Sequence, residues 1–144
     1  MANFISREEA QRITERALSF SNADQARANL QSSDTGNTRF AQNQLSTSGD
    51  ATNATLSITS ALGNKVASAT TNIFTDDALR RVVETSEQLA RLVPENEEYM
   101  GELGAQTYPD TDPYFASTGE LAPERRARAI AAVTEQAVAR NLVS

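Results

Sequence analysis

A two-residue turn, Gly63-Asn64, joins two stretches of alternating apolar and hydroxyl-bearing residues and constrains the fold more than any other feature. Glycine adopts positive φ without steric cost, so the pair suits a tight hairpin turn. With Leu62 opposite Lys65, the expected partners are Leu56 and Thr71, Ile58 and Ala69, Ala54 and Ile73, Ser57 and Thr70, Thr59 and Ser68, and Thr55 and Asn72. The first three pairs form an apolar face and the last three a polar one. The sequence therefore predicts an antiparallel hairpin over residues 54–74 that is covered on one side only.

Three helices are expected around this hairpin. The first, over residues 6–20, begins with the capping box Ser6-Arg7-Glu8-Glu9, in which the serine hydroxyl and a glutamate carboxylate satisfy free backbone N–H groups. The second, over residues 75–93, carries an apolar stripe at helical spacing and is expected to cover the apolar face of the sheet. The third, over residues 123–142, opens with a proline, whose missing N–H costs little at that position.

Residues 25–33 and 38–45 are interpreted as two further strands, separated by the turn cluster Asp34-Thr35-Gly36-Asn37. The alternation of the second of these strands is poor. Together with the hairpin they predict an antiparallel sheet of about four strands within residues 25–74. The expected fold class is therefore α+β, a two-layer α/β arrangement in which amphipathic helices cover one face of the sheet.

Residues 95–122 lack periodicity and are predicted to form a long loop that is rich in aromatic residues. Loops of this length inside a domain are usually functional or are held down by their own side chains. The aromatic residues are therefore expected either to anchor the loop or to contact a partner, and Tyr108 and Tyr114 are the candidate contacts. A chain of this length is expected to form a single domain over residues 1–144.

Histidine and cysteine are both absent, which removes the usual neutral-pH general base and the usual zinc ligands. We therefore expect no catalytic residue, no metal site and no cofactor within these residues. The net charge is −6 and Lys65 is the single lysine, so a nucleic-acid partner is not expected. Arg125, Arg126 and Arg128 are interpreted as a solvated helix face in preference to an anion site.

The two ends of the chain carry different signals. Charged side chains interrupt any apolar run that could serve as a signal peptide or a membrane span, at Arg7, Glu8, Glu9, Arg12, Glu15 and Arg16. A cytoplasmic location is therefore expected, without contact to a membrane. The apolar residues just before Ser144 predict a chain that continues past this point.

One strand has a composition that suits contact with another molecule. Residues 38–44 combine an arginine and three amide side chains with one aromatic residue. Such a pattern fits a strand whose edge meets another backbone, although protection of a free edge explains it equally well. We take Arg39, Phe40, Asn43 and Gln44 as candidate contacts for a peptide or a partner. The segment Asp110-Thr111-Asp112 resembles the first half of a calcium loop, but the glycine and the distal glutamate that complete such a loop are missing. It is therefore interpreted as a turn.

The order and spacing of several segments resemble the TldD/PmbA family of peptidases. The resemblance rests on residues 36–45, the triplet Ser48-Gly49-Asp50, the hairpin over residues 55–72, the helix from Asp77 to Pro94, and the triplet Gln106-Thr107-Tyr108. It implies an amino-terminal α/β domain followed by a larger, mostly β catalytic domain. In catalytic members of the family that second domain binds zinc through a His-Glu-x-x-x-His helix and a later cysteine. None of these ligands maps onto this chain, so the catalytic domain is expected beyond residue 144.

By this resemblance, the chain is expected to be a non-catalytic domain that forms a dimer interface and the walls of a peptide-substrate cleft, for proteolysis or peptide maturation. The implied partners are a second copy or a paralogous subunit and an unfolded or modified peptide. The full-length protein would then be a metallopeptidase, and its zinc ion would be bound outside these residues. The alternative is an acidic protein–protein interaction module, such as a modulator of DNA gyrase, with no protease role.

Overall fold

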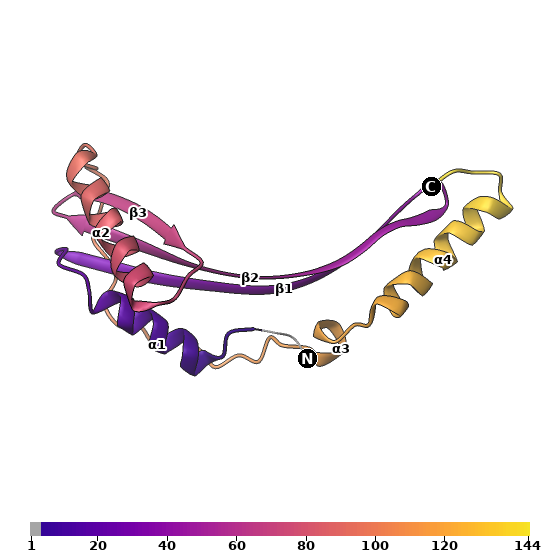
Figure 1. Cartoon of the computed structure of the whole chain (residues 1–144), viewed down its shortest axis with the longest axis horizontal. Helices are drawn as coiled ribbons and strands as arrows, with labels where there is room; N and C mark the ends of the chain where they lie inside the picture. Colours follow the sequence, from indigo (N-terminus) through magenta and orange to yellow (C-terminus); the bar gives the residue numbers. More distant parts are fainter. Residues whose placement is uncertain (1–3) are drawn as a thin grey trace. The chain divides into compact units, whose positions relative to one another are not determined.

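The computed structural model describes residues 4–144 (Figure 1). Its elements, in chain order, are α1 (Arg7–Leu18), β1 (Gln25–Ala41), β2 (Gln44–Leu62), β3 (Lys65–Thr71), α2 (Asp76–Leu92), α3 (Ala116–Gly119) and α4 (Pro123–Ala139). The strands form one antiparallel sheet in the order β1-β2-β3, and the predicted α+β class is confirmed. No helix in the described part of the chain is long and apolar enough to span a membrane.

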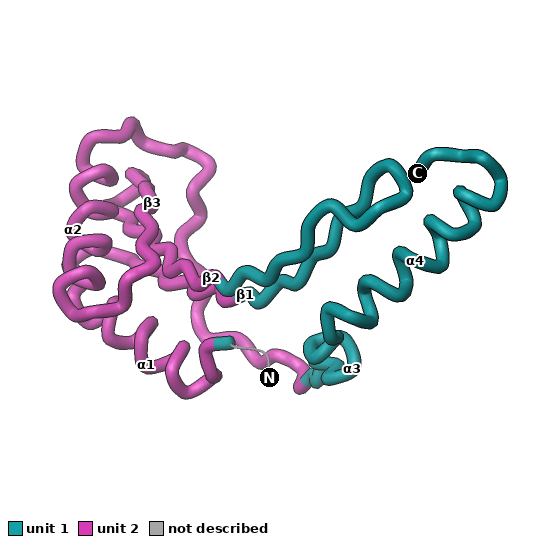
Figure 2. The backbone as a smooth tube through the Cα atoms, turned by 45° about the vertical axis from the view of Figure 1, so that its right-hand side comes forward, with its two compact units in different colours: residues 1–4, 33–52, 111–144 teal, residues 5–32, 53–110 magenta. Residues whose placement is uncertain are grey.

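The chain divides into two compact units (Figure 2). The core unit consists of residues 5–32 and 53–110, and the hairpin unit consists, within the described chain, of residues 4, 33–52 and 111–144. Strands β1 and β2 run through both units. The expectation of a single domain over residues 1–144 stays a prediction.

In the core unit, α2 packs against β3 and α1 packs against α2. Apolar side chains from both helices and from β2 form the buried cluster, which comprises Ile13, Ala17, Leu56, Ile58, Leu79, Val82 and Val83. These residues share one face of each element, as the sequence pattern predicts. The apolar face of the hairpin is therefore covered by helices, as expected.

The register of the predicted hairpin is confirmed from Leu62 opposite Lys65 to Leu56 opposite Thr71. Gly63 has φ 57°, the left-handed conformation that the turn requires. On the polar face, the hydroxyl groups of Thr59 and Ser68 lie 2.8 Å apart. The two outermost expected pairs lie past the end of β3, which is at Thr71.

The prediction of a turn at residues 34–37 is wrong, because β1 continues without a break to Ala41. The chain instead reverses at Gln42 and Asn43, whose φ angles are 53° and 59°, as a two-residue turn with both residues left-handed requires. The sheet therefore has three strands and not four. Most residues of β1 and β2 near this turn are exposed on both faces, so burial imposes no alternation on the sequence there.

The helices begin close to where their sequences predict. The Ser6 hydroxyl accepts a hydrogen bond from the Glu9 backbone N–H at 3.1 Å, which satisfies one free donor of α1. Thr75 is the N-cap of α2 but makes no side-chain capping bond. Helix α4 carries Pro123 in its first turn. Between α2 and α4 the only regular element of the described chain is the short α3, so the predicted loop is present.

Candidate functional site

A guanidinium group joins the strands of the hairpin unit to its helix. Arg126, in the first turns of α4, donates from Nη2 to Asp50 Oδ1 at 2.9 Å, and this carboxylate lies on β2. Its Nε donates to Thr38 Oγ1 on β1 at 3.2 Å, and its Nη1 donates to the Leu121 carbonyl at 3.2 Å. The Arg126 side chain is only 16% exposed. One side chain thus holds both strands and the segment before α4.

This approach depends on a glycine. A methyl group placed at Gly36 would overlap the Arg126 guanidinium and the Asp50 carboxylate. A side chain at this strand position would therefore require the Arg126 and Asp50 side chains to shift. The interpretation of Arg126 as a solvated residue is wrong, because it lies on the packed side of α4 while Arg125 and Arg128 are exposed.

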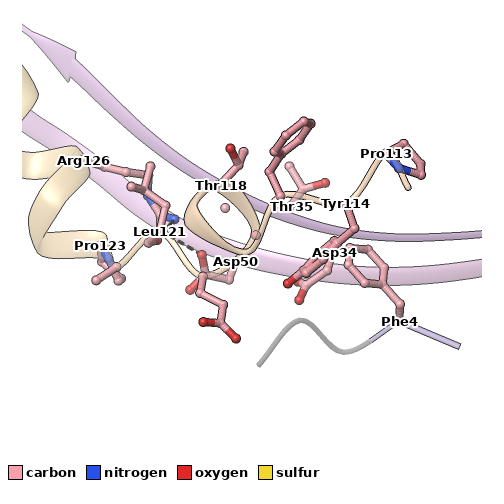
Figure 3. Close-up of a pocket in the computed structure, with 15 residues that line it drawn as sticks. Phe4, Asp34, Thr35, Asp50, Pro113, Tyr114, Thr118, Leu121, Pro123 and Arg126 are labelled. Carbon is pink, nitrogen blue, oxygen red and sulfur yellow. Dashed lines mark hydrogen bonds and ion pairs between the residues drawn. The ribbon is translucent and has the colours of Figure 1, made fainter. Parts of the chain in front are cut away.

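Beside Arg126 the hairpin unit contains a cavity of about 730 Å³ (Figure 3). Its lining combines aromatic rings with charged groups, namely Phe4, Tyr114, Phe115, Asp34, Asp50, Glu120 and Arg126. The rings of Phe4 and Tyr114 meet edge to face, with centroids 6.3 Å apart. A concave site with an aromatic lining and a few convergent polar groups is the usual form of a ligand pocket.

The predicted contact residues Arg39, Phe40, Asn43 and Gln44 all lie at the turn end of the hairpin. Arg39 and Gln44 are exposed, and Phe40 is exposed to 39%. The structure brings these four residues together, as their adjacency in the sequence requires. None of them lines the cavity beside Arg126.

Asn43 has bonding partners that the sequence did not indicate. Its Nδ2 donates to the Leu142 carbonyl at 2.9 Å, and its Oδ1 accepts from the Ser144 backbone N–H at 2.9 Å. The Ser144 hydroxyl also donates to Oδ1, at 2.7 Å. The side-chain amide thus bonds to backbone groups of two residues that follow α4.

The loop tyrosines differ in their environments. The Tyr99 hydroxyl donates to Gln25 Oε1 at 2.9 Å, and the same oxygen accepts the Glu102 backbone N–H at 2.8 Å. Burial raises the pKa of Tyr99, and the nearby Glu102 carboxylate adds to this effect. Tyr99 therefore anchors the loop. Tyr108 is 79% exposed in the core unit, whereas Tyr114 lines the cavity of the hairpin unit.

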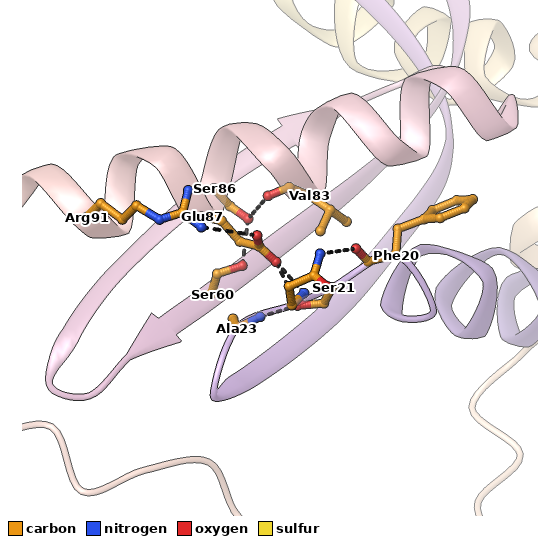
Figure 4. A network of polar contacts seen from close by, with 9 residues as sticks. Phe20, Ser21, Ala23, Ser60, Val83, Ser86, Glu87 and Arg91 are labelled. Atoms are coloured by element: carbon orange, nitrogen blue, oxygen red, sulfur yellow. Dashed lines mark hydrogen bonds and ion pairs between the residues drawn. The ribbon is translucent and has the colours of Figure 1, made fainter.

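The core unit contains a buried polar network of a structural kind (Figure 4). Glu87 on α2 accepts from the Asn22 backbone N–H at 2.7 Å and from the Ser21 hydroxyl at 3.1 Å. The hydroxyl groups of Ser60 and Ser86 lie 2.7 Å apart in the interior. Every one of these groups has a partner within the chain, so the network fixes α2 on the sheet and leaves nothing for a ligand.

Within residues 4–144, no group of three or more histidine, cysteine, aspartate or glutamate side chains is placed to hold a metal ion. The zinc site of a metallopeptidase therefore has no ligand set among the described residues.

The fold defines an α+β domain in which helices pack on a three-stranded antiparallel sheet. Residues 26–90 match the family model described as PmbA/TldA metallopeptidase domain 1. Over residues 26–90 the chain thus matches the amino-terminal domain of the TldD/PmbA family, in agreement with the resemblance found in the sequence.

Solved structures share this fold. The crystal structure of TldE from Thermococcus kodakarensis matches with a TM-score of 0.67 and 13% identity over 84% of this chain. That of a candidate modulator of DNA gyrase from Bacteroides thetaiotaomicron matches with a TM-score of 0.72 and 20% identity over 92% of this chain. The matched region covers only 27% and 31% of those two chains. No curated protein matches the sequence.

Proposed function

We propose that the chain is a non-catalytic amino-terminal domain of a TldD/PmbA-like peptidase subunit, and that its hairpin unit forms a dimer interface and one wall of a peptide-substrate cleft. The peptidase chemistry, with its zinc ion, belongs in this proposal to a catalytic domain of the full-length protein. The second subunit is another copy of the chain or a paralogue.

The observation that carries this proposal is the lack of an interior in the hairpin unit. Thr134 is the only buried residue among those described there, whereas the core unit contains every buried apolar residue of the described chain. Large apolar side chains of the hairpin unit are exposed instead, including Phe40, Leu45, Val133 and Val138. Apolar side chains exposed in such number are typical of a surface that another chain covers.

The cleft wall is proposed because the side chains of the hairpin unit are exposed and because the strands near the turn contain amide side chains. The turn end of the hairpin presents Arg39, Phe40 and Gln44 to solvent, and the Asn43 amide already bonds to backbone groups of the chain. A peptide lying along these strands would meet backbone groups and amide side chains, which recognise an extended chain with little dependence on its sequence.

The interface is tested by measuring the molar mass of the chain in solution by light scattering over a range of concentrations. The variant Val133→Asp places a charge on the exposed side of α4 and is expected to shift the dimer to monomer. Leu92→Asp is the matched control, because Leu92 is 81% exposed at the end of α2 in the core unit and is expected to leave the dimer intact.

A monomer at all concentrations, alone and with a paralogous subunit, would overturn the interface. Zinc bound at one ion per chain, or peptide cleavage by the purified chain, would overturn the non-catalytic assignment. The similarity to a candidate modulator of DNA gyrase supports a second function, that of an acidic interaction module. A monomer that binds gyrase in a fixed ratio would favour that second function.

A further inference from the structure

The cavity beside Arg126 carries more negative than positive charge. Three carboxylates line it, those of Asp34, Asp50 and Glu120, against the single guanidinium of Arg126. All four belong to the hairpin unit. Arg126 and Asp50 compensate each other, so the exposed Glu120 carboxylate favours a cation in the cavity and disfavours an anion.

The guanidinium does not convert the cavity into an anion site. Its Nη2 faces Asp50 at 2.9 Å, so its charge is compensated by a carboxylate of the same lining. Its Nε and Nη1 donate to Thr38 and to the Leu121 carbonyl. A phosphate or carboxylate ligand would have to displace these bonds and would also face Asp34 and Glu120.

The aromatic rings add a second attraction for a cation. Tyr114 and Phe4 meet edge to face, so each ring keeps part of its surface open, and both are close to half exposed. Phe115 lines the same cavity. The face of an aromatic ring attracts an ammonium or guanidinium group, and carboxylates beside it strengthen that attraction.

Close packing beside Tyr114 keeps this arrangement in place. A methyl group at Gly119 would lie 2.7 Å from the Tyr114 hydroxyl and 2.8 Å from its Cε2 atom. The tyrosine ring therefore packs directly on the backbone at the end of α3. This contact with the backbone helps to hold the ring in the cavity wall.

We propose that this cavity binds the cationic side chain of a lysine or arginine residue in a peptide. This inference rests on the proposed function, which supplies the peptide as the ligand. The lining of the cavity supplies the carboxylates and the aromatic rings that would bind the cationic group. A volume of about 730 Å³ accommodates such a side chain together with its neighbouring residues. The hairpin unit would thereby select basic segments along the peptide, while the strands contact its backbone.

The test uses the whole chain and three acetylated, amidated tripeptides, Ala-Lys-Ala, Ala-Leu-Ala and Ala-Glu-Ala, with binding measured by calorimetry and by amide NMR shifts. The lysine peptide is expected to bind at least about tenfold more tightly than the glutamate peptide and to shift the amides of residues 114–120. Added salt is expected to weaken it, as for a charge contact. Equal binding of all three peptides, or none, would overturn the proposal.

Variants locate the site. Tyr114→Leu is expected to weaken the lysine peptide about three- to tenfold through loss of the cation–π contact. Glu120→Gln, which is isosteric and exposed, is expected to weaken it about two- to fivefold. Asp112→Asn is the matched control, because this carboxylate is absent from the cavity lining, and binding is expected to stay unchanged. Equal effects of all three substitutions would place the peptide elsewhere and overturn the proposal.

The two proposals fail separately. A dimer that binds the three peptides alike would remove the basic side-chain site and leave the interface standing. A monomer that binds the lysine peptide selectively would do the reverse.

Discussion

The core unit and the hairpin unit share two strands but are stabilised in different ways. In the core unit, α1 and α2 bury one face of the sheet, and its central side chains are almost completely enclosed. In the hairpin unit, a single long helix accompanies the extended ends of the same strands, and of the described residues only Thr134 is buried. One set of strands thus supports a hydrophobic core in one half and a set of polar links in the other.

The difference shows which half is built for stability and which for contact. Burial of apolar surface stabilises the core unit without any partner. The hairpin unit relies on Arg126 and Asn43, each of which makes several hydrogen bonds between segments distant in sequence. Such bonds fix geometry but add only modest net stability. The hairpin unit is therefore the half whose order should respond most to a partner.

The largest effect is expected from removing a buried side chain on β2. Leu56 is fully buried in the cluster beneath the helices. Leu56→Ala should lower the free energy of unfolding by about 2–5 kcal/mol, because it leaves a cavity as well as losing apolar contacts. Urea denaturation followed by circular dichroism measures this change.

The matched control for this prediction lies on the same strand. Leu45 belongs to β2 in the hairpin unit and is 52% exposed. Leu45→Ala should change the free energy of unfolding by about 0.5 kcal/mol or less. Equal losses from the two substitutions would show that the hairpin unit has a core of its own, and the comparison between the units would fail.

A smaller effect is expected from the hydroxyl pair beneath α2. The Ser86 hydroxyl donates to the Val83 carbonyl at 2.8 Å and lies 2.7 Å from the Ser60 hydroxyl. Ser86→Ala should cost about 1–3 kcal/mol of unfolding free energy, since the Ser60 hydroxyl is then buried without a partner. The double variant with Ser60→Ala should cost less than the sum of the single changes. Strict additivity would show that the two groups do not depend on each other.

The next prediction concerns the polar links of the hairpin unit. Arg126→Met keeps the aliphatic stem of the side chain and removes its bonds to Asp50, Thr38 and Leu121. Hydrogen exchange of amides in β1, β2 and α4 of this unit should accelerate by an amount equivalent to about 1–2 kcal/mol. The core unit should keep its protection.

Arg125→Met is the control for that substitution, because Arg125 is the exposed neighbour on α4. Its exchange rates should match those of the unsubstituted chain. If Arg126→Met instead accelerates exchange equally in both units, the chain unfolds as one cooperative domain and the division into two units has no energetic meaning.

The core unit could be predicted from the sequence in some detail, because burial leaves a periodic pattern. Alternation around Gly63-Asn64 gave the register to the residue, and helical spacing gave the cover formed by α2. Both signals arise because a buried face tolerates few polar side chains. Glycine in the turn added a local requirement that no other residue meets as easily.

The hairpin unit could not be predicted in the same way. Its strands are exposed on both faces, so their sequence carries no alternation, and the polar residues 34–37 resembled a turn. The role of Arg126 depends on Gly36 and Asp50, which lie far away in the sequence and meet it only in the folded chain. A lone glycine within a polar strand was the one local signal of a close approach.

The smallest predicted effect concerns an exposed ion pair between α1 and α2. Arg16 donates from Nε to Asp76 Oδ1 at 2.9 Å and from Nη2 to Oδ2. This hydrogen-bonded pair lowers the pKa of Asp76 below its usual value. The folded chain therefore binds a proton at Asp76 less readily than the unfolded chain does. Its contribution to stability is present above about pH 4, the usual aspartate pKa, and is lost as the pH falls through the lower folded-state value.

An NMR titration of the Asp76 carboxyl carbon tests the pair directly. Arg16→Gln should raise the pKa of Asp76 toward the usual aspartate value, and the remaining Arg80 nearby should keep the rise incomplete. Arg12→Gln, on the same helix but paired with Glu9, should leave that pKa unchanged. Because the pair is exposed, its effect on stability should be far smaller than that of Leu56→Ala. An unchanged pKa in Arg16→Gln would mean that this ion pair does not form in solution and does not help to hold the two helices together.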